Sequence, residues 1–339
     1  MNKKSLILAE IYRQNKQWKD SDAFFSCLKS IKYPRKLYSK ILPFLDKKEI
    51  ISVVGLRRVG KTVLLKQLIR EKIKQVKPTN IFFLTFDEAL FSAEIGLEDY
   101  INAYLEIVAD SREKLYIFLD EIQYAPKWQH IVKRYYDTEP DCKFIISGSS
   151  SLFLKRQTTE SLAGRIYEFM MPILDFEEYL QMRTVDSDIL ESYRKGAVNI
   201  GQEIKSKSET AELVYKYGAV MQKKFHDYLF YGQFPQIVCE EDIEIKKKYL
   251  REAVYKKTIE HDIPKIFSID KIGELKFLFQ VLINEAGNII EIENLAAEVG
   301  LSKETTVKYL RYFEDSFLIH FLYNFSKSFR KSKRLLKKI

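Results

Sequence analysis

Short apolar runs alternate with longer amphipathic runs through the first half of the chain. The runs that have the length and composition of strands lie at 49–55, 81–86, 115–121, 143–149 and 165–171. Helical periodicity separates them at 62–76, 97–110 and 127–138. Because strands that are apolar on both faces need cover on both sides, this alternation predicts a parallel sheet with helices on both faces. We expect this α/β core over residues 49–175.

The regions on either side of this core have helical patterns. Residues 1–48 predict a polar helical segment, whose apolar face is formed by Leu37, Ile41, Phe44 and Leu45. Residues 176–268 predict a helical lid or linker region. Within that region, residues 183–212 are polar and poorly periodic, and they fit either a loop or an exposed helical insertion.

Residues 269–326 predict three further helices. The apolar stripe of the first helix is formed by Ile272, Leu275, Phe279, Leu282 and Ile283. The second helix covers 292–299, Gly300 follows in the turn, and Ser302 is placed to cap the third helix. This helix-turn-helix pattern predicts a winged-helix domain, which a basic tail follows at 327–339.

The net charge of +9 is concentrated in that tail. Seven Lys or Arg and no acid lie between Lys327 and Lys338, so the rest of the 339-residue chain is nearly neutral. The tail is either a solvated helix end or a contact for phosphates or anionic lipid. The overall balance of 46% hydrophobic and 30% charged residues is that of a globular protein.

The positions of the cysteines and the lengths of the apolar stretches indicate the cellular compartment. Cys27, Cys142 and Cys239 lie far apart and predict neither a zinc site nor a disulfide framework. The first residues lack the apolar region of a signal peptide, and the longest apolar stretch, 317–325, is too short to span a membrane. We therefore expect a cytoplasmic protein.

The sequence GLRRVGKT at 55–62 matches the phosphate-binding pattern G-x-x-x-x-G-K-[ST], between an apolar strand and an apolar helix. Its glycines let backbone N–H groups turn toward a phosphate, and the helix adds its positive dipole end. Lys61 is placed to reach the β- and γ-phosphates, and Thr62 to bind Mg²⁺. Arg57 and Arg58 either help to hold phosphate or are exposed. The residues predicted to bind ATP are Gly55, Leu56, Arg57, Arg58, Val59, Gly60, Lys61, Thr62 and Val63.

Two acids, Asp120 and Glu121, end the third predicted strand. An Asp at the carboxyl end of a central strand can hold Mg²⁺ together with Thr62, and the adjacent Glu can activate a water for attack on the γ-phosphate. The alternative is an acid pair at a helix N-terminus. Their position about 60 residues after the phosphate loop favours the catalytic interpretation. A catalytic Glu also favours hydrolysis over transfer to another molecule.

Three further residues are candidates for the same chemistry. Ser149, or alternatively Ser147, ends or follows the fourth strand. Such a serine either contacts the attacking water or γ-phosphate or caps the next helix. Arg165 precedes the fifth strand. An Arg can neutralise charge on the transferring phosphoryl group, often from a neighbouring subunit, but the residues alone favour a surface arginine.

Together these residues resemble a family, the bacterial and archaeal AAA-type ATPases that join an ATPase core to a winged helix and a C-terminal domain of unknown function. The segments that carry the resemblance are GLRRVGKT, IFLDEIQYAPKW, FIISGSSSLFL, SLAGRIYEFMMPILDFEEYL and FYGQFPQIV. The resemblance covers roughly residues 33–325. It implies that ATP is bound with Mg²⁺ and hydrolysed. Lys61 and Thr62 then contact phosphate and metal, Asp120 holds the metal, and Glu121 activates the water.

The resemblance extends to three further features. It suggests Ser149 as the γ-phosphate sensor and Arg165 as an arginine finger, and the segment from Gly232 to Pro235 looks like the family's marker after the core. Members of the family continue into a further domain that can resemble a nuclease fold, whereas this sequence ends at Ile339. That domain is either absent or the sequence is a fragment.

Three functions fit these features. The first is an ATPase that acts as a switch or motor on an unidentified protein partner, in an arrangement compatible with a homo-oligomer. The second is an ATP-regulated DNA-binding protein, because the third C-terminal helix carries Lys303, Lys308 and Arg311; Glu304 and Glu314 on the same helix argue against it. The third, a small-molecule kinase, is disfavoured by the catalytic glutamate and the resemblance.

Overall fold

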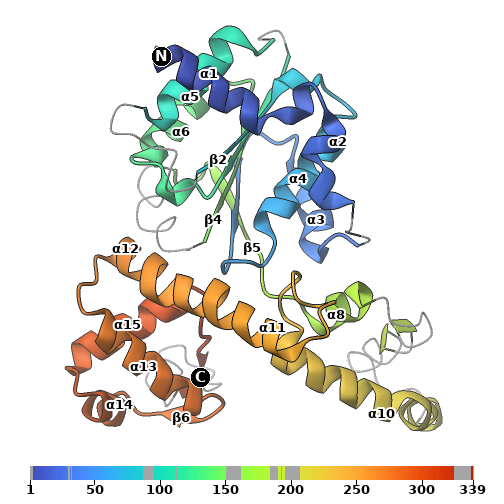
Figure 1. The fold of residues 1–339 in the computed structure, drawn as a ribbon, viewed down its shortest axis with the longest axis vertical. Coiled ribbons are helices and arrows are strands. Elements are labelled where there is room, and N and C mark those ends of the chain that lie inside the picture. Colours follow the sequence, from blue (N-terminus) through green and yellow to red (C-terminus); the bar gives the residue numbers. More distant parts are fainter. Residues whose placement is uncertain are drawn as a thin grey trace.

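The computed structural model describes residues 3–29, 31, 33–86, 95–110, 113–149, 162–183, 190–191, 193–194, 207–323 and 337–338. Its largest unit is a parallel five-stranded sheet of order β2-β3-β4-β1-β5 (Figure 1). The strands are β1 (Ile50–Val54), β2 (Ile81–Thr85), β3 (Leu115–Asp120), β4 (Cys142–Gly148) and β5 (Ile166–Met170). Each strand that the apolar runs predict is therefore confirmed.

Helices cover both faces of the sheet, as the alternation predicts. One face is covered by α1 (Lys3–Gln14), α5 (Leu97–Ile107) and α6 (Trp128–Thr138), and the other by α2 (Ser21–Phe24), α3 (Lys36–Ile41) and α4 (Lys61–Lys72). Successive strand residues point to opposite faces. Ile50 and Val54 therefore join one apolar cluster, and Ile51 and Val53 join the other. The two clusters fix the position of the loop after β1.

The N-terminal segment packs onto the edge strand β2 through side-chain amides. Asn15 donates from Nδ2 to the carbonyl of Phe83 (2.8 Å) and accepts from its N–H at Oδ1 (2.7 Å). Gln14 accepts from the N–H of Thr85 (2.7 Å), and Trp18 donates to the carbonyl of Ile81 (2.8 Å). These bonds take the place of a further strand and close an edge that otherwise invites pairing with another chain.

Helices dominate the chain after the sheet. They are α8 (Phe176–Met182), α10 (Lys207–Tyr231), α11 (Ile243–Tyr249), a π-helix (Leu250–Asp262), α12 (Ile263–Phe267), α13 (Ile272–Asn284), α14 (Ile292–Val299) and α15 (Lys303–Asp315). Short 3-10 turns occur at Lys16–Trp18, Ser26–Leu28, Leu42–Phe44, Pro78–Asn80 and Ile122–Tyr124. Most of the polar stretch 183–212 lies outside the described residues.

Residues 259–323, which we call the C-terminal module, have an apolar core of their own. The three predicted helices are confirmed as α13, α14 and α15. Gly300 ends α14 in the left-handed region (φ 72°), and the Ser302 hydroxyl caps α15 by accepting from the N–H of Thr305 (3.1 Å). A small antiparallel sheet of order β6-β8-β7 completes this part, with β6 at Ile289–Ile290, β7 at Leu322–Tyr323 and β8 at Lys337–Lys338.

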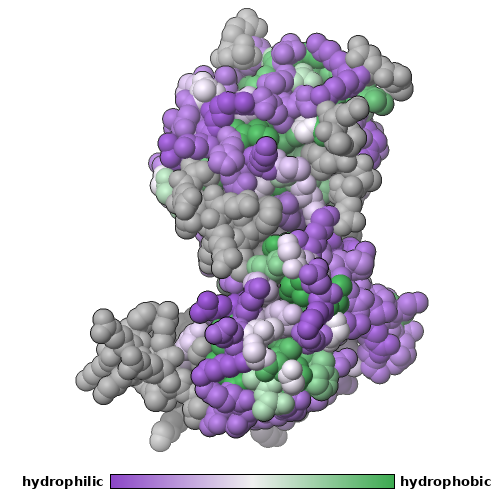
Figure 2. All heavy atoms as spheres, turned by 90° about the vertical axis from the view of Figure 1, so that its left-hand side faces the viewer, coloured by the Kyte–Doolittle hydropathy of each residue, from purple (hydrophilic) through white to green (hydrophobic). Residues whose placement is uncertain are grey.

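In this view the module forms a lobe below the sheet, and the π-helix leads into it (Figure 1). Seen from the side, this lobe shows atoms of hydrophobic residues among mostly hydrophilic ones (Figure 2). Within the described residues, no helix has both the length and the apolar composition needed to cross a membrane. Apart from residues 337–338, the basic tail at 327–339 lies outside the described part of the chain.

Candidate nucleotide site

The predicted phosphate loop runs from the end of β1 to the start of α4, and its two glycines are required by geometry. A Cβ on Gly55 would lie 2.3 Å from the carbonyl oxygen of Met171, a distance that no side chain tolerates. Gly60 caps α4 with φ at 101°, in the left-handed region. The loop therefore curls tightly over the carboxyl end of β1, and the N-terminus of α4 points into this curl.

The side chain of Lys61 lies inside this curl and is almost fully buried. Its Nζ donates to the carbonyls of Gly55 (3.1 Å) and Leu56 (3.2 Å), and it lies 3.8 Å from Oε1 of Glu121. The structure thus brings the predicted phosphate-binding lysine and the predicted catalytic glutamate into one ion pair.

Asp120 is buried between two hydroxyl groups. Thr62 donates from Oγ1 to Oδ2 of Asp120 (2.6 Å), and Ser147 donates to its other carboxylate oxygen. Burial raises the pKa of the Asp120 carboxyl, and the nearby charge of Glu121 raises it further, while both hydroxyl donors oppose the shift. A threonine hydroxyl and a carboxylate oxygen, side by side at a helix N-terminus, are the hard oxygen donors that Mg²⁺ prefers.

Glu121 leaves the strand in a left-handed conformation (φ 54°), and its side chain is one-quarter exposed. Gln123 donates from Nε2 to Oε2 of Glu121 (2.5 Å) and to the hydroxyl of Ser149 (3.0 Å). Gln123 therefore links Ser149 to Glu121, whereas Ser147 is bonded directly to Asp120. The sequence gives no reason to single out Gln123, except that it falls within the motif IFLDEIQ.

Arg165 lies at the amino end of the parallel strands, whereas the phosphate loop lies at their carboxyl end. Its carbonyl accepts from the N–H of Ile50, at the start of β1, while the loop follows the end of that strand. Five residues of strand separate the two by roughly 16 Å. The guanidinium donates to Asp137 (3.1 Å). Within one chain, the structure does not bring Arg165 to Lys61.

The two arginines of the loop have different surroundings. Arg58 is exposed, with φ at 70°. Arg57 is partly buried, and its Nε donates to Asp262 of the C-terminal module (3.1 Å). Burial favours the neutral form of Arg57, but the charge of Asp262 and the contact with the Tyr124 hydroxyl outweigh it and raise the pKa of the guanidinium. Asp262 is a residue that sequence reasoning missed.

Arg35, also missed, is buried beneath the loop. Its guanidinium pairs with the equally buried Glu178 (2.8 Å), donates to the carbonyl of Val59 within the loop (2.7 Å) and donates to that of Pro172 (2.8 Å). One side chain therefore joins the N-terminal segment, the phosphate loop and α8.

Replacing Arg35 with alanine is expected to lower the free energy of unfolding by about 3–5 kcal/mol, because Glu178 would remain as an unpaired buried charge. Denaturant unfolding measures this loss. Arg134→Ala is the matched control, since Arg134 and its partner Glu98 are both about half exposed, and it should cost about 1 kcal/mol or less. Equal losses in the two variants would show that the buried pair contributes no more than a surface pair.

The segment after α10 packs against α8 and the phosphate loop. A Cβ on Gly232 would lie 2.6 Å from the ring of Tyr179, so only glycine permits this approach. Phe234 is buried in the same apolar cluster as loop residue Val59. Pro235 lies 4.0 Å from the position of a Cβ on Gly60. The Gly232–Pro235 segment thus packs against the phosphate loop.

Two family models match this chain. A model for an AAA domain matches residues 47–180, and a model for a domain of unknown function, DUF8612, matches residues 222–339. Residues 47–180 are therefore an AAA domain, joined in this chain to a domain of unknown function. The AAA match covers the whole five-stranded sheet, the phosphate loop and the acids at the end of β3.

Relatives of this chain occur in archaea and bacteria. Two uncharacterised proteins of Methanocaldococcus jannaschii are 29% and 28% identical, each over 86% of this chain, and one of Haemophilus influenzae is 26% identical over 83%. The chain spans 59%, 60% and 64% of the lengths of these relatives.

Similar solved structures include Aeropyrum pernix Orc1 in complex with DNA and Saccharomyces cerevisiae Hsp104 in complex with casein. The Orc1 structure has a TM-score of 0.34 and 10% identity, and the match covers 86% of this chain and 84% of Orc1. The Hsp104 structure has a TM-score of 0.34 and 12% identity, over 80% of this chain and 51% of Hsp104.

Proposed function

We propose that this AAA protein binds ATP with Mg²⁺ at the loop 55–62 and hydrolyses it. The observation that carries the proposal is the pair of contacts around α4. Thr62 bonds Asp120 at 2.6 Å, and Lys61 lies 3.8 Å from Glu121. The helix N-terminus, the lysine, the two acids and the hydroxyl that phosphate hydrolysis requires therefore meet at one point.

Each of these groups has a distinct part in the proposed reaction. The loop N–H groups and the Lys61 ammonium hold the phosphates. Thr62 and Asp120 would hold Mg²⁺, which neutralises phosphate charge when it is bound. Within the described residues there is no cluster of three or more His, Cys, Asp or Glu that could hold a metal. A two-ligand site completed by phosphate and water oxygens fits Mg²⁺.

Glu121 would take the proton from the attacking water. Its carboxylate is partly exposed, and Gln123 fixes one of its oxygens, which orients the other. Ser149, on the same Gln123, is the proposed contact for the γ-phosphate or the water. The use of Glu121 as a base toward water supports hydrolysis over phosphoryl transfer to a small molecule.

The proposed use of this hydrolysis is to switch or move the C-terminal part against a protein partner. Phosphate release from ATP, measured alone and with DNA, RNA or candidate proteins, tests both levels of the proposal. Mg²⁺-dependent release supports hydrolysis, and stimulation identifies the class of partner. No binding of ATP at millimolar nucleotide would refute the proposed site.

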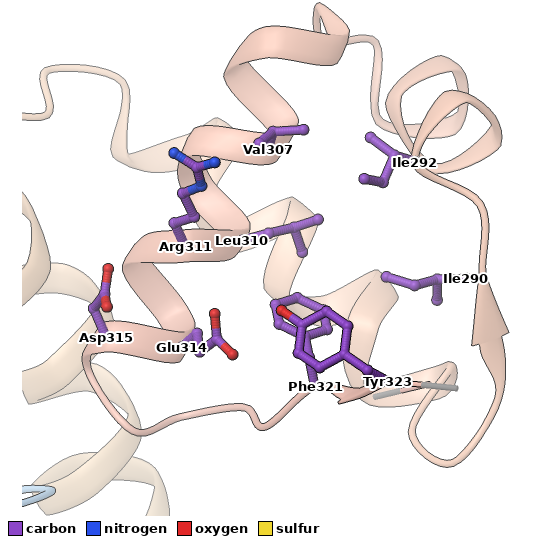
Figure 3. A pocket seen from close by; sticks show the side chains of 9 residues that line it. All are labelled: Ile290, Ile292, Val307, Leu310, Arg311, Glu314, Asp315, Phe321 and Tyr323. Carbon is purple, nitrogen blue, oxygen red and sulfur yellow. The ribbon is translucent and has the colours of Figure 1, made fainter. Parts of the chain in front are cut away.

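An ATP-regulated DNA-binding protein is the second candidate. The turn between α14 and α15, with the small sheet β6-β8-β7, supports the winged helix that the sequence predicts. The charges on α15 support it only weakly. Lys303 forms an ion pair with Glu293, and Arg311 lines a cavity of about 470 Å³ together with Glu314 and Asp315 (Figure 3). A fluorescence titration with duplex DNA decides the matter: affinity that falls steeply with salt supports DNA binding, and absence of binding at low salt excludes it.

Arg165 is proposed to act on the site of a neighbouring subunit, because it lies at the end of the strands opposite the phosphate loop of its own chain. Mixing Lys61→Ala with Arg165→Ala protein should then restore part of the hydrolysis that each lacks alone, because one subunit type supplies an intact loop and the other an intact arginine. Phosphate release after mixing measures the rescue. A mixed oligomer that remains inactive would contradict this role.

A further inference from the structure

One carboxylate of the C-terminal module reaches the phosphate loop. Asp262 is the last residue of the π-helix, and only 7% of its surface is exposed. Its Oδ2 accepts from Nε of Arg57 (3.1 Å), and its Oδ1 accepts from the hydroxyl of Tyr124 (3.2 Å). Arg57 also donates to the Tyr124 hydroxyl (3.4 Å). The three side chains form a closed triangle in which both carboxylate oxygens are used.

Each corner of this triangle belongs to a different functional part. Arg57 lies in the phosphate loop, and Tyr124 lies three residues after Glu121. Asp262 lies between Ile259 and Ile263, which are fully buried in the core of the C-terminal module. Because these neighbours are fixed in that core, the bond between Asp262 and Arg57 ties the phosphate loop to the module.

The triangle also lies within the electrostatic field of the site. Burial raises the pKa of the Asp262 carboxyl, and Arg57 opposes this shift; the charges of Glu121 and Lys61 act on it as well. On the neighbouring helix, Lys265 lies 4.8 Å from the ring centre of Tyr124. A phosphate group that enters the loop would meet Arg57 already neutralised by Asp262, and would be repelled by that carboxylate.

We propose that Asp262 is a further residue of the nucleotide site, which competes with the γ-phosphate for Arg57 and so makes the docking of the C-terminal module depend on whether ATP or ADP is bound. The inference rests on the proposed nucleotide binding at the loop. ADP, which lacks the γ-phosphate, leaves the triangle closed; ATP draws Arg57 away and loosens the module around Asp262. A partner that binds the released module therefore raises the affinity for ATP. By linkage, ATP raises the affinity for that partner by the same factor.

The first test compares nucleotide affinities of two amide variants on the same helix. Asp262→Asn removes the competing charge and keeps the shape. Its affinity for ATP should rise about tenfold, within the usual range for coupled sites, while its affinity for ADP changes less than about threefold. Glu260→Gln is the matched control, because it removes the same charge from a pair with Lys276 (2.6 Å) away from the triangle. It should bind both nucleotides as the unmodified protein does.

The second test needs no substitution. Hydrogen exchange of the peptide that spans 255–268 should speed up when a non-hydrolysable ATP analogue and Mg²⁺ are added, and should stay unchanged with ADP. An unmodified protein that binds ATP while Asp262→Asn behaves as Glu260→Gln does, or binds ATP more weakly, overturns the inference alone. So does equal exchange with the analogue and with ADP. Failure of the unmodified protein to bind any nucleotide overturns the proposed function as well.

Discussion

Replacing Lys61 with alanine is expected to weaken ATP binding about 30-fold or more and to abolish measurable hydrolysis. The ammonium is buried inside the loop, where it makes two bonds to loop carbonyls and lies 3.8 Å from Glu121. A buried charge contact of this kind is worth about 2–5 kcal/mol when its partner is also charged, which is at least a factor of about 30 in affinity. Isothermal titration with ATP and Mg²⁺ measures the change.

Lys74→Ala is the matched control for this experiment, because Lys74 follows α4 and pairs with Glu71 on the surface. It should bind ATP normally. A thermal melt of Lys61→Ala checks that the loop still folds, since Gly55, Gly60 and Arg35 hold it without the lysine. Unchanged ATP affinity in a folded Lys61→Ala protein would refute the phosphate-binding role of the loop.

Glu121→Gln is expected to lower the rate of hydrolysis about 10²- to 10⁴-fold, the usual contribution of a general base, while ATP remains bound. The amide keeps the size of the side chain and its contact with Gln123, but it cannot take a proton from water. It also releases Lys61 from the ion pair at 3.8 Å, so ATP affinity should be equal or tighter. Phosphate release and nucleotide titration, measured on the same preparation, separate the two effects.

Glu139→Gln serves as the control for that loss of charge, because Glu139 is exposed at the end of α6, away from the loop. Its hydrolysis rate should equal that of the unmodified protein. Full turnover by Glu121→Gln would move the catalytic base elsewhere. Loss of ATP binding in that variant would instead mean that Glu121 helps to build the phosphate site.

These residues show that the phosphate loop is held by distant parts of the chain as well as by the sheet. Arg35 reaches it from the N-terminal segment, Pro235 lies against Gly60, and Asp262 binds Arg57 from the C-terminal module. Each of these three parts therefore contacts the loop directly. This arrangement is what a switch requires, since binding energy at one site has to alter contacts at another.

The sequence alone was sufficient for the sheet and for the centre of the site. Alternating apolar runs predict all five strands, because strand and helix periods are local properties of the chain. The loop 55–62 is also recognised from the local sequence, because its two glycines have the spacing of a tight curl that only glycine allows. Asp120 was predicted beside Thr62 because parallel strands bring their carboxyl ends to one edge, and the two lie 2.6 Å apart.

Only the tertiary structure decided the long-range partners. Arg35 and Glu178 lie 143 positions apart, and Arg57 and Asp262 lie 205 apart. No local pattern marks such pairs, because an isolated charge in a sequence reads as an exposed one until packing buries it. The same holds for Asn15, whose amide completes the edge of β2. The sequence thus determined which residues form the proposed phosphate loop, and packing determined which distant residues contact it.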